Sequence, residues 1–133
     1  MKTLIIQGRL PGLNDLINAE RTNKYIAAQM KKRDMELVVW CAKRHLNGWK
    51  ASAPVVMHYR WYEPNTRRDK DNVSAYGRKI IQDALVVGGY LENDGWKQIV
   101  GFDDTFFVDK DNPRIEVEIE ERTETKLQRK ATA

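Results

Sequence analysis

The alternation of apolar and polar residues predicts two β-strands most clearly. Residues 55–62 alternate, and one of their two faces consists of Val55, Met57, Tyr59 and Trp61. Residues 114–120 alternate in the same way, and one face consists of Ile115, Val117 and Ile119. Because successive side chains of a strand point to opposite sides, each segment has one buried and one solvent-facing side. A short strand over residues 3–7 and a loop over residues 8–14 are expected before them.

Apolar residues at helical spacing predict two main helices. The first covers about residues 18–46, has room for one break and ends at Asn47-Gly48. Its apolar stripe is interrupted by Lys31-Lys32-Arg33. That basic side is either a solvated surface opposite a core-facing stripe or a surface that faces phosphates. The second helix covers about residues 73–87.

The remaining segments complete a small α/β fold. Residues 98–102 and 105–108 are expected to be short strands around a turn at Asp103-Asp104, and residues 121–133 a flexible C-terminal tail. The order of elements predicts a single domain over residues 1–120, with a mixed β-sheet flanked by two main helices.

Composition is typical of an intracellular globular protein. Of the 133 residues, 41% are hydrophobic and 32% are charged. No apolar run approaches the ~20 residues of a membrane span, and the apolar N-terminus is too short for a signal peptide. The single cysteine, Cys41, excludes a disulfide framework. We therefore expect a cytoplasmic protein without a membrane partner.

Charge is unevenly distributed along the chain. The net charge is +4, and residues 1–50 hold ten Lys/Arg against four Asp/Glu. Residues 51–133 hold thirteen Lys/Arg against fifteen Asp/Glu. A basic body with an acidic focus suits an enzyme that acts on nucleic acid at a metal site, although many ordinary domains share this distribution.

The acidic focus is the segment Arg67-Arg68-Asp69-Lys70-Asp71-Asn72. If this segment is extended, Asp69 and Asp71 point the same way. Like charges that close repel each other unless a cation compensates them, and Mg²⁺ prefers such oxygen ligands. The alternative is a solvated turn in which Asp71 or Asn72 caps the following helix.

A third carboxylate is needed for a two-metal phosphodiesterase, and Asp94 is the candidate. Asp83, in the middle of the second helix, is expected to be a structural cap or an ion-pair partner. His58 is expected on the sheet surface, because no second His or Cys lies at metal-ligand spacing. The remaining acids of this half are assigned to turns: Asp103, Asp104, Asp109 and Asp111.

Together these motifs resemble the RusA-type Holliday-junction resolvases of phages and prophages. The resemblance rests on Arg68-Asp69-Lys70-Asp71-Asn72, on Lys79 with Asp83-Ala84-Leu85, and on Gly89-Tyr90-Leu91 leading to Asp94. It covers residues 54–120 well and reaches the N-terminal loop through Pro11 and Asn14.

This resemblance implies a small α/β domain that forms a homodimer and cleaves four-way DNA junctions with Mg²⁺, for which Mn²⁺ is a possible substitute. It implies that Asp69, Asp71 and Asp94 are the metal carboxylates and that Lys79 is the catalytic lysine. Residues expected to contact the branched DNA are Arg67, Arg68, Lys70, Asn72 and Asn14. The implied setting is recombination and repair in the cytoplasm of a bacterial host.

The position of the lysine departs from the family pattern. In the best-known members it follows the second Asp by four residues, where this chain has Ala75. Lys79 lies four residues further on, which adds ~6 Å of rise on an unbroken helix. A loop or extra turn over residues 74–77, which Gly77 favours, would let Lys79 keep its place.

Three other functions compete with a junction resolvase. A nuclease of the Asp…Glu-x-Lys type has one matching triplet, Glu124-Thr125-Lys126, inside the expected tail. A non-catalytic basic DNA-binding module would use the Asp pair only as a helix cap. A structural or interaction protein with an incidental acidic turn is the third, and the combined motif argues against it.

Overall fold

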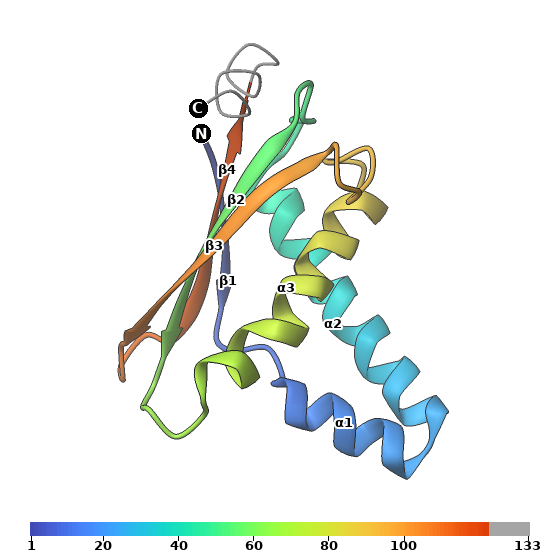
Figure 1. Ribbon diagram of the computed structural model, residues 1–133, viewed down its shortest axis with the longest axis vertical. Coiled ribbons are helices and arrows are strands. Elements are labelled where there is room, and N and C mark those ends of the chain that lie inside the picture. Colours follow the sequence, from blue (N-terminus) through green and yellow to red (C-terminus); the bar gives the residue numbers. More distant parts are fainter. Residues whose placement is uncertain (123–133) are drawn as a thin grey trace.

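The computed structural model describes residues 1–122, which form a four-stranded sheet with helices on one side (Figure 1). The strands are β1 (Lys2–Gln7), β2 (Val55–Glu63), β3 (Ile99–Val108) and β4 (Arg114–Glu121). Their order across the sheet is β1-β4-β2-β3. β2 pairs in parallel with β3 and antiparallel with β4, which in turn pairs antiparallel with β1. The expected α/β domain with a mixed sheet is thereby confirmed.

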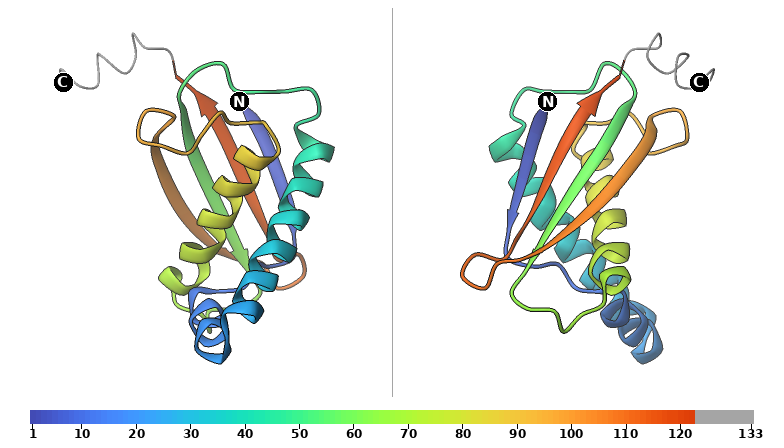
Figure 2. Two further views of the ribbon diagram at one scale, coloured as in Figure 1. Left: turned by 90° about the vertical axis from the view of Figure 1, so that its right-hand side faces the viewer. Right: turned by 60° about the vertical axis from the view of Figure 1, so that its left-hand side comes forward.

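Three helices, rather than two main ones, cover one face of this sheet: α1 (Leu13–Thr22), α2 (Lys24–His45) and α3 (Lys70–Val87) (Figure 2). The expected first helix therefore begins five residues early and is divided at Asn23. The side-chain oxygen of Asn23 accepts a hydrogen bond from the Ile26 backbone N–H at 2.9 Å. Asn23 is thus the N-cap of α2, and its extended backbone breaks the helix there.

The core lies between the helices and the inner face of the sheet. Alternation in β2 is confirmed, because its inner side chains are at most 2% exposed: Val55, Met57, Tyr59 and Trp61. Burial of a side chain as large as Trp61 contributes about 3 kcal/mol. α3 approaches this ring so closely that a Cβ on Gly77 would lie 3.0 Å from it. Gly77 therefore allows close packing inside a continuous helix, and the alternative of a loop or extra turn over residues 74–77 is wrong.

Two further expectations are wrong in the same half of the chain. α3 begins at Lys70 rather than at Val73, so the acidic motif enters the helix. Asp103-Asp104 is not a turn, because β3 runs without interruption through both residues in parallel register with β2. Pairing with β2 supplies backbone partners, and both aspartates also have side-chain partners, described below. Tertiary contacts thus override the turn preference of two successive aspartates.

The C-terminal strand extends one residue beyond the expected domain end. Glu121 belongs to β4, and its carboxylate accepts hydrogen bonds from the backbone N–H and the hydroxyl of Ser52 at 3.0 and 3.1 Å. Arg122 is described too, and its backbone N–H donates to the Pro54 carbonyl at 2.7 Å. Residues 123–133 of the expected tail, which include Glu124-Thr125-Lys126, fall outside the described residues. Among residues 1–122, no helix is long and apolar enough to cross a membrane.

Candidate functional site

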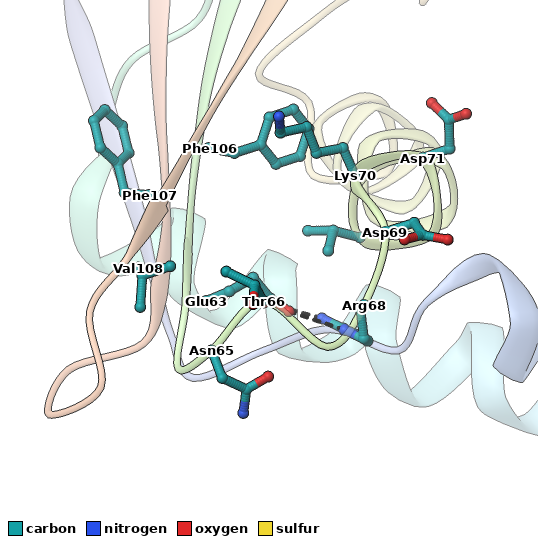
Figure 3. Close-up of a pocket in the computed structure, with 11 residues that line it drawn as sticks. Glu63, Asn65, Thr66, Arg68, Asp69, Lys70, Asp71, Phe106, Phe107 and Val108 are labelled. Carbon is teal, nitrogen blue, oxygen red and sulfur yellow. Dashed lines mark hydrogen bonds and ion pairs between the residues drawn. The ribbon is translucent and has the colours of Figure 1, made fainter.

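The two aspartates of the motif lie at the N-terminus of α3. Asp69 is the N-cap residue, and its backbone oxygen accepts a hydrogen bond from the Val73 N–H at 3.0 Å. Its carboxylate makes no capping hydrogen bond, and Asp71 lies in the first helical turn. Both side chains are exposed, and both point away from Phe106 and Phe107 (Figure 3). The motif is therefore not extended, and neither Asp71 nor Asn72 is the cap, yet two carboxylates remain available together.

A hollow of about 550 Å³ opens beside this helix start. It lies between the loop that leads from β2 to α3 and the last residues of β3 (Figure 3). Its lining combines carboxylates, cations and apolar side chains: Glu63, Asn65, Thr66, Arg68, Asp69, Lys70, Asp71, Val73, Phe106, Phe107 and Val108.

Glu63 holds this loop through two guanidinium groups. Arg68 donates from Nε and Nη2 at 2.9 and 3.0 Å, and Arg9 donates from Nη2 at 2.9 Å. Arg68 also donates to the Leu10 carbonyl at 3.2 Å. Burial alone would raise the pKa of the Glu63 carboxyl, but Arg68 and Arg9 together hold that pKa below its usual value. The guanidinium of Arg68, one of the expected DNA contacts, is therefore occupied in holding the loop before Asp69 against Glu63 and Leu10.

Asn72 and Asn14, two other expected DNA contacts, meet each other. The Asn72 side-chain oxygen accepts a hydrogen bond from the Asn14 backbone N–H at 2.8 Å. The contact is tight, because a Cβ on Gly12 would lie 2.5 Å from that oxygen. Asn72 thus satisfies a free N–H at the start of α1 and joins α1 to the acidic motif. Of the expected contacts, Arg67 and Lys70 are the exposed cations beside Asp69.

A second acidic cluster consists of Asp83 and Asp94, which meet at Lys79. Lys79 and Asp83 belong to α3, and Asp94 lies in the segment that follows this helix. The Lys79 ammonium contacts the carboxylates of Asp83 and Asp94 at 2.9 and 3.1 Å. The hydrogen bond from Lys79 lowers the pKa of Asp94, and the hydrogen bonds that Lys79 donates to Asp83 and Asp94, the first more than the second, raise the pKa of Lys79. The expectation that Asp83 is an ion-pair partner is confirmed.

The structure does not bring Lys79 or Asp94 to Asp69 and Asp71 within one chain. α3 is unbroken, so eight residues from Asp71 to Lys79 correspond to about 12 Å of rise. In residues 1–122, no three His, Cys, Asp or Glu side chains gather into a group that could hold a metal ion. The expected three-carboxylate set is therefore divided between the start of α3 and the segment that follows α3, where Asp94 meets Lys79.

Asp104, which was expected in a turn, lies on β3 beside the middle of α3, between the two acidic clusters. Its carboxylate accepts a hydrogen bond from Trp61 Nε1 at 2.9 Å and contacts Arg78 Nη1 at 2.6 Å. The Arg78 guanidinium in turn lies 4.6 Å from the centre of the Phe102 ring. Alternation of Phe102, Asp104 and Phe106 on one face was the sequence signal for this continuous strand. Arg78 is a partly exposed cation that sequence reasoning missed.

The helix-free face of the sheet is occupied by cross-strand ion pairs. His58 lies there, as expected, with its ring nitrogens 2.6 Å from Asp103 and 2.9 Å from Glu120. The hydrogen bond with Glu120 is the main cause that raises the pKa of His58, and His58 in turn helps to lower the pKa of Glu120 to about 2. The charges of this face are thus paired with one another across the strands.

Comparison with known proteins agrees with these features. The family model of endodeoxyribonuclease RusA matches residues 14–120, which include both acidic clusters and all of α3. No curated protein matches the chain.

Proposed function

Because the chain belongs to the RusA family of endodeoxyribonucleases, we propose that it resolves four-way DNA junctions by Mg²⁺-dependent hydrolysis. Manganese would substitute for magnesium, and the setting would be recombination and repair in the cytoplasm of a bacterial host that carries a phage or prophage. The observation that supports this proposal best is the exposed pair Asp69 and Asp71 at the start of α3.

These two carboxylates fit a divalent cation. Both are hard oxygen donors, and neither makes an ion pair within residues 1–122. Magnesium commonly takes one or two carboxylates, keeps several waters and accepts phosphate oxygens in its remaining positions. When bound, the cation supplies an activated water and stabilises charge on the scissile phosphate.

The residues around the pair would bind and orient the DNA. Arg67 and Lys70 are exposed cations on either side of Asp69 and would neutralise neighbouring phosphates. Arg68 and Asn72 would support DNA binding indirectly, by positioning the acidic motif. Arg68 fixes the loop before Asp69, and Asn72 joins α3 to α1. Arg78 would add positive charge along α3 where the phosphate approaches.

A homodimer offers a way to unite Asp94 with the pair. β3 lies at the edge of the sheet and pairs only with β2 in the described chain. One end of β3 borders the hollow at Asp69, and the other end borders Asp94. Antiparallel pairing of two such edges about a two-fold axis would bring Asp94 of one protomer toward Asp69 of its partner.

Cleavage of a labelled four-way junction tests the proposed activity. With Mg²⁺ we expect paired nicks in opposing strands, and with EDTA we expect binding alone. A matched linear duplex should remain uncut. A protein that binds the junction but never cuts it would instead be the non-catalytic DNA-binding module.

Mixed protomers test the shared site. A mixture of Asp69→Asn and Asp94→Asn protomers should recover nicking, because each heterodimer holds one site with both aspartates intact. If each site belongs to a single chain, every site in the mixture is damaged and nicking stays absent.

A further inference from the structure

An apolar groove lies along α2 and reaches α3 only at Val87, at the opposite end of that helix from the acidic motif. It has a volume of about 700 Å³ and is formed by α2 together with the last residue of α3. Figures 1 and 2 show these two helices side by side. The apolar floor of the groove consists of Ala28, Met35, Val39, Trp40 and Val87. Its charged rim consists of Lys31, Lys32, Glu36 and Lys43.

Two large apolar side chains of this groove are left in solvent. Trp40 is 56% exposed and Val87 is 69% exposed. A half-exposed tryptophan beside an apolar hollow is typical of a protein-binding surface, where tryptophan often dominates affinity. Neither residue contributes to the acidic clusters described above.

The rim around the floor is basic. Three lysines and one glutamate, all on α2, line the groove. Lys31 has only a distant and exposed partner, Glu20, at 3.9 Å. Within residues 1–122, Lys32 and Lys43 form no ion pair. A partner that enters this groove therefore meets an apolar floor inside a positive field.

We infer that this groove binds an acidic peptide segment that carries one or two large apolar side chains. The apolar side chain would bury against Trp40 and Val87, and its carboxylates would face the lysines. The groove shares no lining residue with the hollow at Asp69, and its Val87 end lies about 27 Å along α3 from Asp69. The DNA site would remain open while the partner is bound.

Other occupants fit the groove less well. A second copy would bring a rim of three lysines and one glutamate against an identical rim, so two surfaces of net positive charge would meet. Residues 123–133 carry three Lys/Arg against one Glu, so the chain's own C-terminal segment has the wrong charge. Single-stranded DNA would need an aromatic plane for stacking, but the Arg44 guanidinium lies over the Trp40 ring at 4.9 Å. The aliphatic floor offers no second plane.

Fluorescence anisotropy with a labelled peptide of four aspartates followed by leucine and phenylalanine tests this inference. Trp40→Ala should weaken binding about tenfold or more, and Val87→Asp should act in the same direction. Lys32→Glu and Lys43→Glu should each weaken binding, most strongly at low salt. Tyr25→Ala is the matched control, because Tyr25 is an exposed aromatic residue of α2 outside the groove, with Lys24 over its ring.

The same variants distinguish this inference from the proposed nuclease activity. Trp40→Ala and Val87→Asp should cut a four-way junction at the wild-type rate while losing the peptide. The inference is wrong if the peptide does not bind, or if it binds equally well to Trp40→Ala. It is also wrong if a peptide with alanines in place of leucine and phenylalanine binds as tightly, or if Lys32→Glu weakens duplex DNA binding but not peptide binding.

Discussion

At the start of α3, Asp69 and Asp71 are exposed and form no ion pair within the described chain, whereas Asp83 and Asp94 further along share the ammonium of Lys79. The two groups look alike in sequence, since each holds two aspartates and lies near a lysine. They differ in what compensates their charge. At the first group a dication would relieve repulsion, while at the second it would have to compete with Lys79.

The two regions also differ in how they are held. The loop before Asp69 is held by Glu63, whose carboxylate accepts hydrogen bonds from Arg68 and Arg9. The backbone of the loop is therefore fixed without any contact from the carboxylates of Asp69 and Asp71. The segment before Asp94 is fixed partly by the aspartate itself, through Lys79. A carboxylate whose position depends on another group is better suited to move or to join a second ligand set than to hold a cation alone.

The largest expected effect is on cleavage by Asp69→Asn or Asp71→Asn. Each change removes one ligand charge and keeps nearly the same shape, so we expect a loss of roughly a thousandfold in the cutting rate. Junction affinity should hold or rise, because one negative charge leaves a surface that meets phosphates. Gel shifts and cleavage on one junction measure both quantities.

Asp111→Asn is the matched control for this first prediction, because Asp111 is an exposed aspartate in the turn between β3 and β4. It should leave both quantities unchanged. Near wild-type cutting by Asp69→Asn would place the metal elsewhere and make Asp69 only the N-cap of α3.

Asp94→Asn and Asp83→Asn separate a ligand from an ion-pair partner. If Asp94 joins the catalytic set, its variant should lose about a hundredfold in cutting, while Asp83→Asn should lose little. Both changes remove one of the two carboxylates that face Lys79, so their structural effects are similar. Equal loss in the two variants would show that only the local ion pair matters.

Glu63→Gln tests whether Glu63 holds the loop that precedes Asp69 and Asp71. The amide keeps the shape but loses the charge that Arg9 and Arg68 share, so we expect the free energy of unfolding to fall by about 2 kcal/mol. Urea denaturation measures the change, and Glu92→Gln at an exposed position is the control. An unchanged midpoint would mean that the loop is held by its other contacts.

Much of the fold followed from local pattern. β2 and β4 each have one buried face, and period two alone identifies such strands. β3 was divided incorrectly because Asp103 and Asp104 prefer turns, and their compensation by His58, Arg78 and Trp61 comes from distant segments. Gly77 suggested a loop or extra turn for the same reason. The glycine is there because the Trp61 ring, which is distant in sequence, packs against it.

The candidate site could be predicted only as a set of residue types. The pattern identified Asp69, Asp71 and Asp94 as carboxylates of interest, but it left open whether the helix is continuous through residues 74–77, and the continuous helix keeps Lys79 away from Asp69 and Asp71. Arg68 and Asn72 were predicted to contact DNA because the resemblance places them in the family's motif beside the acids. Their partners, Glu63 and Asn14, depend on how the chain folds back.

Metal-linked stability should distinguish the two acidic groups directly. At ten times the dissociation constant, a cation that binds only the folded protein adds about 1.4 kcal/mol, or about 5 °C in Tm. We expect Mg²⁺ or Mn²⁺ to produce this shift in the wild type and in Asp83→Asn but not in Asp69→Asn. A shift that survives in Asp69→Asn would assign the cation to another site.

The smallest expected effect is the pH dependence that Lys79 gives to stability. The hydrogen bond from Lys79 lowers the pKa of Asp94 from its usual value of 3.8, so its contribution is present above pH 3.8 and is lost as pH falls through the lowered pKa. Contacts with Asp83 and Asp94 raise the pKa of Lys79 above 10.5, so its contribution is present below pH 10.5 and is lost as pH rises through the raised pKa.

Lys79→Met should therefore lower the free energy of unfolding between about pH 4 and pH 10 and should match the wild type in strong acid. The Lys79 side chain is 65% exposed, so solvent screening holds the difference below about 1 kcal/mol. Urea denaturation at several pH values measures it, with Lys97→Met, at an exposed lysine, as the control. A difference that persists unchanged in strong acid would mean that Lys79 stabilises the protein through packing of its aliphatic chain, and the contrast between a paired and an unpaired group of carboxylates would then lose its electrostatic basis.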